Sequence, residues 1–323
     1  MAEKTAIIYN PSAGRGKAQR KKQEVLDYLK ARKIRFDLFI TKSEAHLVET
    51  AIKVAHDYPV IIGAGGDTTI NLIAQEILEL KKGNVLGIIS LGSTNDLARE
   101  IGVNKLEHAC DAIIAGVSRA LDVGYITTGK QERPHTFLAQ ACMGLGVTVN
   151  RYVAAWMRKH TFLSRFHSLA QIIAGGAAIH HSFKAKEVPM NLELESSNGS
   201  RSFKSPLLII SNTSLFAARF KPSPWANPMD GKLDCSIFNT TTFPRFFKAA
   251  LQVNSQKHLI DNKVEVLQDS YFKIRSPQPF EFQVDGEVIP SDGEIDAAVK
   301  PGALQVIINR DLSPKMGAAD TGG

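Results

Sequence analysis

The sequence predicts an α/β + β protein, in which an N-terminal α/β domain with a mostly parallel sheet precedes a C-terminal antiparallel β-sandwich domain. A chain of 323 residues is long enough for two domains of ordinary size. Up to residue 126, short apolar runs alternate with amphipathic helical patterns, which is typical of βαβ units. Beyond that point, strand-like runs follow one another with turn residues between them. We place the domains at 1–126 and 127–311, with a disordered tail at 312–323.

The first domain is predicted from five short runs that are almost entirely apolar. Strands of a parallel sheet have this composition when helices cover both faces. The runs are "TAIIY", "IRFDLFI", "PVIIGA", "VLGIIS" and "ALDVGYI". The helical patterns between them cover Lys17–Arg32, Glu44–Asp57, Thr69–Lys81 and Asn95–Ala115, the last with a break near Gly102.

The second domain is predicted from runs in which apolar and polar residues alternate. "NLELE" and "FEFQV" show this period of two most clearly, and it indicates strands with one face on a core. Further strand-like runs are "HTFLAQACMG", "SFKSPLLIISN", "KLDCSIFN", "KVEVLQDSYFKIR" and "ALQVIIN". Between Asn150 and His181 the pattern indicates a helix or an irregular segment.

Composition and charge limit the classes of protein. A hydrophobic share of 44% and a mean hydropathy of −0.09 are typical of a soluble globular protein. The three widely spaced cysteines and the start "MAEKTAIIYN", which lacks the pattern of a secretory leader, predict reduced thiols and a cytoplasmic location. A net charge of +7 permits nucleic acid, an anionic membrane surface or phosphorylated substrates as partners.

Small residues follow three of the predicted parallel strands, at the point where each next helix begins. The three loops are "YNPSAGRGKA", "GAGGDTTIN" and "SLGSTNDLA". Open α/β sheets bind ligands at the carboxyl ends of their strands, and glycines let backbone N–H groups approach an anion at a helix N-terminus. One such loop is an ordinary tight turn, but three on neighbouring strands predict a phosphate-binding site. None has the P-loop or the dinucleotide-binding pattern, so we expect a phosphate site of another kind.

Two of these loops carry an aspartate, and two roles fit each one. Asp67 and Asp96 could hold Mg²⁺ directly or through water, because Mg²⁺ prefers one or two carboxylates together with phosphate oxygens. Each could instead cap a helix by accepting hydrogen bonds from its first N–H groups. The pattern alone leaves both roles open.

The motifs, taken in order, resemble those of the diacylglycerol kinase catalytic-domain family, which includes bacterial diacylglycerol kinase and the sphingosine and ceramide kinases. "NPSAG" matches N-P-x-[SA]-G, "GGDTT" with Asn71 lies on G-G-D-G-T-x-N-E, and "GSTND" matches G-[ST]-x-N-D. Later in the chain, "MDGKLD" resembles D-G-x-L-D and "VDGE" resembles D-G-E. Both order and spacing fit over nearly the whole chain, so the combination is specific although each piece is modest.

The resemblance implies an ATP-dependent lipid kinase that phosphorylates a hydroxyl of a diacylglycerol-like lipid, an activity of lipid metabolism and phospholipid biosynthesis. It implies an NAD-kinase-like nucleotide domain and a lipid-binding β-sandwich, with the active site in the cleft between them. The nucleotide would contact residues of the three loops and one residue after the second strand. These are Asn10, Pro11, Ser12, Gly14, Thr41, Gly65, Gly66, Asp67, Thr68, Thr69, Asn71, Gly92, Ser93, Asn95 and Asp96.

The resemblance also implies a metal site and a catalytic base. Mg²⁺ would sit at Asp230, helped by the carbonyl groups of Asn227 and Lys232, and Asp285 or Glu287 would accept the proton of the substrate hydroxyl. The chemistry agrees, because phosphoryl transfer needs positioning, charge neutralisation and one carboxylate near the acceptor oxygen. Without the resemblance, Asp285 and the glycine after it would be interpreted as a polar hairpin turn, because Asp-Gly is a common hairpin pair.

Two positions depart from the family pattern, which has Gly where this chain has Thr68 and Glu where it has Leu72. If the glycine adopts a positive φ, threonine there is strained by on the order of 1–3 kcal/mol. We expect retained but altered activity, with the loop shifted so that the Thr68 hydroxyl donates to phosphate. The alternative is lost nucleotide affinity, which would leave a degenerate kinase that acts as a nucleotide- or lipid-binding protein.

A basic region free of Asp and Glu lies between Arg133 and Lys186. It mixes aromatic and basic side chains, which suits peripheral docking on an anionic membrane surface. The residues concerned are Trp156, Arg158, Lys159, Phe162, Arg165 and Phe166. The alternative is that they form the core and lip of the second domain.

Two further interpretations are weighed against a lipid kinase. An NAD kinase shares the fold and the glycine-rich loop, but "NPSAG" and "MDGKLD" speak against it. Nucleic acid is not expected as a partner, because no strand has the interleaved aromatic and basic residues of RNA-binding domains. A homodimer is left open, as is the identity of the lipid.

Overall fold

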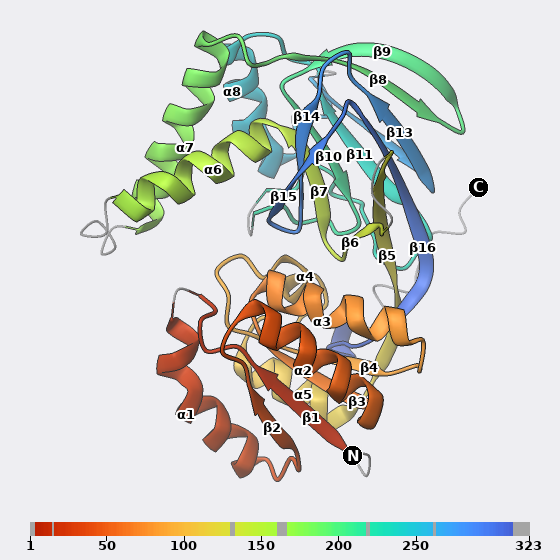
Figure 1. Ribbon diagram of the computed structural model, residues 1–323. Coiled ribbons are helices and arrows are strands. Elements are labelled where there is room, and N and C mark those ends of the chain that lie inside the picture. Colours follow the sequence, from red (N-terminus) through yellow and green to blue (C-terminus); the bar gives the residue numbers. More distant parts are fainter. Residues whose placement is uncertain are drawn as a thin grey trace.

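The computed structural model describes residues 4–14, 16–129, 133–159, 167–217, 220–260 and 263–312. An α/β unit forms one end of the molecule and a β-sandwich forms the other (Figure 1). The predicted fold class is therefore confirmed.

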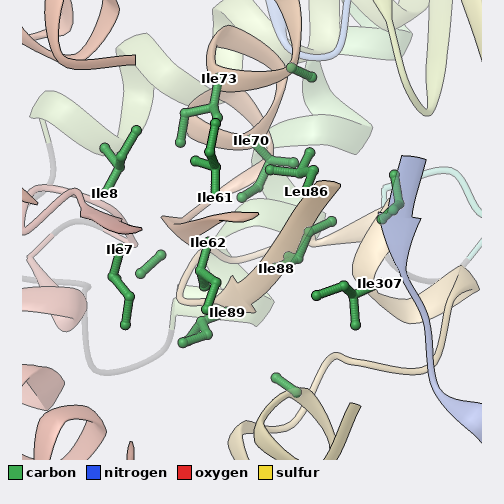
Figure 2. Close-up of a cluster of buried hydrophobic side chains, with 14 of the residues drawn as sticks. Ile7, Ile8, Ile61, Ile62, Ile70, Ile73, Leu86, Ile88, Ile89 and Ile307 are labelled. Atoms are coloured by element: carbon green, nitrogen blue, oxygen red, sulfur yellow. The ribbon is translucent and has the colours of Figure 1, made fainter. Parts of the chain in front are cut away.

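The first sheet has four parallel strands in the order β2-β1-β3-β4. Its side chains are mostly buried on both faces, because helices cover both, except in the edge strand β2, where they are exposed or half-buried. Figure 2 shows Ile8 and Ile61 on one face with Ile73, and Ile7 and Ile62 on the other. The strands are β1 (Thr5–Tyr9), β2 (Asp37–Ile40), β3 (Val60–Gly65) and β4 (Val85–Ser90).

The helices of this unit agree closely with the predicted ranges. They are α1 (Lys17–Ala31), α2 (Glu44–Asp57), α3 (Asp67–Leu80), α4 (Asp96–Glu100) and α5 (Leu106–Ala115). The predicted break near Gly102 is confirmed, because α4 ends two residues before it and Gly102 has a φ of 73°. An ordinary L-residue adopts that conformation poorly, so the helix stops there.

The sandwich packs a six-stranded antiparallel sheet, in the order β12-β11-β10-β7-β14-β15, against strands of the larger sheet. Between the sheets lies a core that includes Phe137, Leu208, Phe272 and Phe282. The strands are β6 (His135–Phe137), β7 (Gln140–Gly144), β8 (Met190–Ser196), β9 (Gly199–Ser205), β10 (Leu207–Ser211), β11 (Leu233–Phe238), β12 (Val264–Asp269), β13 (Tyr271–Arg275), β14 (Phe280–Val284) and β15 (Glu287–Ser291).

Two long strands run through both units. β5 (Ser118–Thr128) pairs with β16 (Glu294–Ile307) along most of its length, with a register shift between Lys300 and Leu304. β16 pairs with β13 in the sandwich and then, through Gln305 and Val306, in parallel with β4. The ten-stranded sheet is therefore continuous across the molecule, and the boundary predicted at residue 126 falls inside a shared strand.

Three helices cover one side of the sandwich: α6 (Leu145–Lys159), α7 (His167–Lys184) and α8 (Phe243–Gln252) (Figure 1). Two short 3-10 turns follow later, η2 (Val253–Ser255) and η3 (Arg310–Leu312). α6 and α7 occupy the segment predicted as helical or irregular, whereas α8 was not predicted. No helix among the described residues is both long enough and apolar enough to cross a membrane.

Some predicted features lie outside the described residues. They are Arg15 in the first loop, Phe162, Arg165 and Phe166 of the basic region, the side chains of Arg158 and Lys159, and the tail from residue 313.

Candidate active site

The three glycine-rich loops touch one another at the carboxyl edge of the parallel sheet. A Cβ atom on Gly92 would lie 2.6 Å from the Cα of Gly66, so the second and third loops meet backbone to backbone. Gly14 has a φ of 59°, and a Cβ there would lie 2.4 Å from the carbonyl oxygen of Leu91 in the third loop. Glycine is therefore required at these contacts by close approach as well as by backbone conformation.

Side chains add further connections between the loops. Asn10 Nδ2 donates to Thr69 Oγ1 at 2.9 Å, which joins the first loop to the second. Within the third loop, Asn95 adopts a φ of 53° and its side chain bonds both backbone groups of Gly92, at 2.9 and 3.1 Å. Asparagine tolerates this left-handed conformation better than most residues because its amide bonds locally.

Asp67 joins the second loop to the third. Its carboxylate accepts from Thr94 Oγ1 at 2.5 Å, from the Asn95 N–H at 2.8 Å and from the Asp96 N–H at 3.0 Å. This is the capping role, but Asp67 caps the start of α4 and not its own helix. Asp96 is buried, and its carboxylate accepts from Gln140 Nε2 of the sandwich at 3.1 Å.

Thr68 is not strained, so the expectation of a positive φ at this position is wrong. It is the second residue of α3, its side chain is exposed, and it is not among the non-glycine residues with positive φ. Gly66 caps the helix in an extended conformation, with a φ of −99°. Position 68 therefore accepts any helix-compatible residue. Leu72 packs against the core of the first unit.

The predicted nucleotide residues divide into exposed and enclosed ones. Ser12, Thr68 and Ser93 present exposed side chains, one from each loop. Thr41 and Asn71 are buried, and their polar atoms bond the carbonyl groups of Tyr9 and Thr136. The structure thus places these two side chains in contacts that hold the loops.

Asp285 and Gly286 form the two-residue turn between β14 and β15, with φ values of 42° and 100°. The Asp285 carboxylate reaches the segment before β7. It accepts from the N–H groups of Leu138 at 2.7 Å and Gln140 at 2.9 Å, and Ala139 N–H is shared between its two oxygens at 3.2 and 3.4 Å. Four contacts use the lone pairs that a carboxylate offers.

Burial raises the pKa of Asp285 to about 7, and the charge of Asp67 acts in the same direction. The three N–H donors oppose this rise because they bond the ionised form. Asp67 and Asp285 also line the same small cavity between the two units.

Glu287, the first residue of β15, has an exposed side chain, and its carboxylate makes no hydrogen bond to any described residue. It lies near His135 of β6. Burial lowers the pKa of His135, and the charge of Glu287 opposes that effect. Of the two predicted acids, Glu287 is therefore the one whose oxygens are available to a substrate.

A small cavity of about 20 Å³ lies where the two units meet. The second and third loops and the turn between β14 and β15 all contribute to its wall. The residues concerned include Gly65, Gly66, Asp67, Asn95, Ala139 and Asp285. Its volume suits about one water molecule, so a larger ligand would have to lie on the open side of the loops.

Asp230, at the predicted metal position, interacts electrostatically with Asp122 and with Asp234, although the three side chains do not converge as metal ligands do. Asp230 Oδ1 accepts from the Lys232 N–H at 3.0 Å, and Oδ2 accepts from Gln268 Nε2 at 3.2 Å. Burial raises the pKa of Asp230, and the charge of Asp122 adds to the rise. Burial together with the charge of Asp230 raises the pKa of Asp234 to about 7.

A divalent cation suits this group by charge. Asp234 Oδ2 is buried and has no hydrogen-bond partner among the described residues, and a cation would supply one while neutralising the repulsion from Asp230. No three His, Cys, Asp or Glu side chains in the described ranges converge as metal ligands do. Further ligands would therefore have to be backbone carbonyl groups or water.

Several polar residues of the cleft were missed by sequence reasoning. Asp122 accepts from the N–H groups of Gly231 and Gly302, each at 2.7 Å, and an acid inside the apolar run "ALDVGYI" was the available signal. Asn212 bonds the carbonyl groups of Asp122 and Leu138 at 2.9 and 2.8 Å. No sequence pattern distinguishes Asn212 from an ordinary loop asparagine.

The two units match two different domain models. Residues 4–126 match the diacylglycerol kinase catalytic domain, and residues 144–308 match the YegS C-terminal NAD kinase beta sandwich-like domain. Diacylglycerol kinase from Bacillus subtilis (strain 168) is 24% identical over 288 residues, which cover 88% of this chain and 90% of that protein.

Two further comparisons find similarity to the same group of proteins. Diacylglycerol kinase from Staphylococcus aureus (strain bovine RF122 / ET3-1) is 32% identical over 126 residues, which span 38% of this chain and 40% of that protein. The crystal structure of a diacylglycerol kinase from Bacillus anthracis str. Sterne shares the fold with a TM-score of 0.70 at 16% identity, covering 96% of this chain and 98% of that one. This chain belongs to the diacylglycerol kinase family, with the catalytic domain of that family followed by its NAD kinase-like β-sandwich.

Proposed function

We propose that this protein is an ATP-dependent lipid kinase that transfers a phosphoryl group to the hydroxyl of a diacylglycerol-like lipid. The observation that carries the proposal is the shared wall of the small cavity, where the glycine-rich loops meet the acid-bearing turn of the sandwich. Phosphoryl transfer needs a phosphate-binding surface beside a proton acceptor, and these two parts supply them. The family of the chain supports the same reaction.

The nucleotide phosphates would bind on the open side of the three loops. The first N–H groups of α3 have no partner within the helix, and the dipole of α3 favours an anion at that end. The exposed hydroxyl groups of Ser12, Thr68 and Ser93 stand at the same edge. Because Thr68 is helical and unstrained, backbone strain at this position gives no support to a degenerate kinase.

Mg²⁺ would supply charge neutralisation on the phosphates and, at Asp230 and Asp234, on the paired carboxylates. The chain's own part there is to hold the loop before β11. Asp230 fixes the Lys232 N–H, and Asp122 fixes the Gly231 N–H. Asn227 bonds the Met229 N–H through its side-chain oxygen at 3.2 Å, so its carbonyl group is oriented by the same loop.

Glu287 is the proposed base. Its carboxylate would accept the proton of the lipid hydroxyl while the hydroxyl oxygen forms a bond to the γ-phosphorus of ATP. The bond between the γ-phosphorus and the β–γ bridging oxygen would break at the same time, and ADP would leave. Three backbone N–H groups already bond the Asp285 carboxylate through four contacts. Asp285 is therefore proposed as the residue that fixes the turn carrying Glu287.

The test is transfer of radiolabelled phosphate from ATP to a panel of membrane lipids, with Glu287→Gln as the variant. Replacing the base should lower kcat by about 10²–10⁴-fold with an unchanged unfolding midpoint, because general-base catalysis contributes on that scale. Arg151→Gln, which breaks an exposed ion pair with Glu281 on the neighbouring strand, is the control and should keep its activity. Full activity of Glu287→Gln would contradict the assignment of the base. NADP formation from NAD without lipid phosphorylation would contradict the lipid kinase.

A lipid substrate places the working enzyme at a membrane surface. We propose a cytoplasmic protein that associates with anionic membranes peripherally, with a homodimer as an open possibility.

A further inference from the structure

Exposed apolar side chains gather on one part of the sandwich. Nine large apolar residues are exposed among those described, and five of them lie between residues 220 and 260. They are Phe220, Trp225, Phe247, Leu251 and Ile260. A soluble domain scatters such residues singly, so a cluster of this kind indicates an interaction surface.

Contacts bring these segments together around α8. Phe216 and Phe220 bond each other through their backbones at 2.7 and 2.9 Å, and Phe216 packs against the cluster that contains Phe246 of α8. The ring of His258 bonds the carbonyl oxygen of Pro222 at 3.2 Å. The described residues 215–217 and 220–226, α8 and the turn 256–260 therefore form one surface, which we call the α8 face.

One side of α8 is buried and the opposite side is exposed. Phe246, Ala249 and Val253 point inward and pack on the outer side of the six-stranded sheet. Phe247 and Leu251 lie on the opposite side of the helix with exposed fractions of 48% and 69%. They are four residues apart, so they form one ridge. Nothing in the described part of the chain covers that ridge.

The charged residues in the sequence of this segment are all basic. From Cys235 to Ile260 the sequence contains Arg245, Lys248 and Lys257 but no Asp or Glu. All three basic residues are exposed, and none has an ion-pair partner among the described residues. Exposed aromatic and aliphatic residues beside unpaired cations fit the boundary between anionic headgroups and acyl chains.

We propose that the α8 face docks on an anionic membrane surface, with Phe247 and Leu251 entering the headgroup region and Arg245 and Lys248 contacting lipid phosphates. Its residues lie outside the basic region of residues 133–186, although α7 of that region packs against α8 through His180 and Phe183. The purpose of this docking rests on the proposed function, since a lipid kinase must reach a substrate held in the bilayer. The binding itself does not require catalysis.

The experiment is flotation of the full chain with vesicles of phosphatidylcholine, with and without phosphatidylglycerol. Wild type should bind the vesicles that contain phosphatidylglycerol. Phe247→Ser combined with Leu251→Ser should lower the partition coefficient about tenfold or more, because each apolar side chain that leaves the interface removes its burial. Arg245→Gln combined with Lys248→Gln should lower binding to anionic vesicles only. Ile114→Ser, at a residue 43% exposed on α5, is the matched control and should bind as wild type does.

Two further measurements separate the outcomes. Circular dichroism and the thermal midpoint establish that each variant is folded, and phosphorylation of a short-chain, water-soluble diacylglycerol should be unaffected by the α8 changes. Unchanged vesicle binding by folded Phe247→Ser/Leu251→Ser would overturn the proposal. A wild-type dimer that this variant converts to monomer, without vesicle binding, would instead assign the face to a second copy. Vesicle binding without any kinase activity would leave the α8 face standing while the proposed function fails.

Discussion

The two units contribute different groups to the small cavity where they meet. On the α/β side, three loops present backbone N–H groups and touch through glycines. On the sandwich side, the turn between β14 and β15 contributes the carboxylate of Asp285. Yet Asp67 on one side and Asp285 on the other do the same work, because each accepts hydrogen bonds from backbone N–H groups of another segment. A motif acid is thus not automatically a ligand for metal or substrate.

The comparison is sharpest when each of the two carboxylates is replaced by an amide. Asp285→Asn should lower the free energy of unfolding by about 3 kcal/mol, because its four contacts to backbone N–H groups include two that an amide NH₂ cannot accept. Asp67→Asn should lower it by about 2 kcal/mol, since one of its three donors is a hydroxyl that can rotate. Urea denaturation of both variants measures the difference. A larger loss for Asp67→Asn would reverse the ranking of the two sides.

The glycine contact between loops is the next largest effect. Gly92→Ala places a Cβ 2.6 Å from the Cα of Gly66, so the loops must separate. We expect a loss of about 1–3 kcal/mol, the usual scale of overpacking, together with weaker ATP binding measured by calorimetry. Gly176→Ala in α7 is the control, because its Cβ meets nothing within 4 Å. That change should raise stability by about 0.5–1 kcal/mol. ATP affinity equal to wild type in Gly92→Ala would indicate that the nucleotide does not use this junction.

The smallest effect is expected at Thr68. A strained threonine would make Thr68→Gly stabilising, but position 68 is an exposed helical residue. Glycine should therefore lower stability by about 0.5–1 kcal/mol through its helix propensity. Thermal unfolding checks the direction. ATP binding restored only in the glycine variant would show that the threonine obstructs the nucleotide, in spite of its relaxed backbone.

Sequence patterns predicted the helices and strands whose signals lie within a single segment of the chain. The range Glu44–Asp57 was predicted to the residue because its apolar period and its N-cap Ser43 lie within one segment. Pairing between distant strands carries no such signal, so nothing indicated that β16 reaches β4. α8 was missed because "FPRFFKAALQ" follows a strand-rich region and its apolar residues read equally well as a short strand.

The residues of the candidate site also divide into those that sequence motifs predicted and those whose contacts the motifs could not predict. Motif order identified the loops and the acids, including Asp67, Asp96 and Asp285. It did not tell which acids are engaged, because the partners of Asp285 are backbone N–H groups of residues 138–140, about half the chain away. Gln140 and Asn212 bond across segments that come together only in three dimensions.

The path of β16 also bears on how the protein is made. The last residues of this strand cover the edge of β4, so the sheet that carries the loops lacks this neighbour until residues 305 and 306 have left the ribosome. An uncovered strand edge is a template for wrong pairing. The α/β unit, although encoded before the sandwich, is therefore completed only after the sandwich strands have been synthesised, and its edge depends on a distant segment for protection.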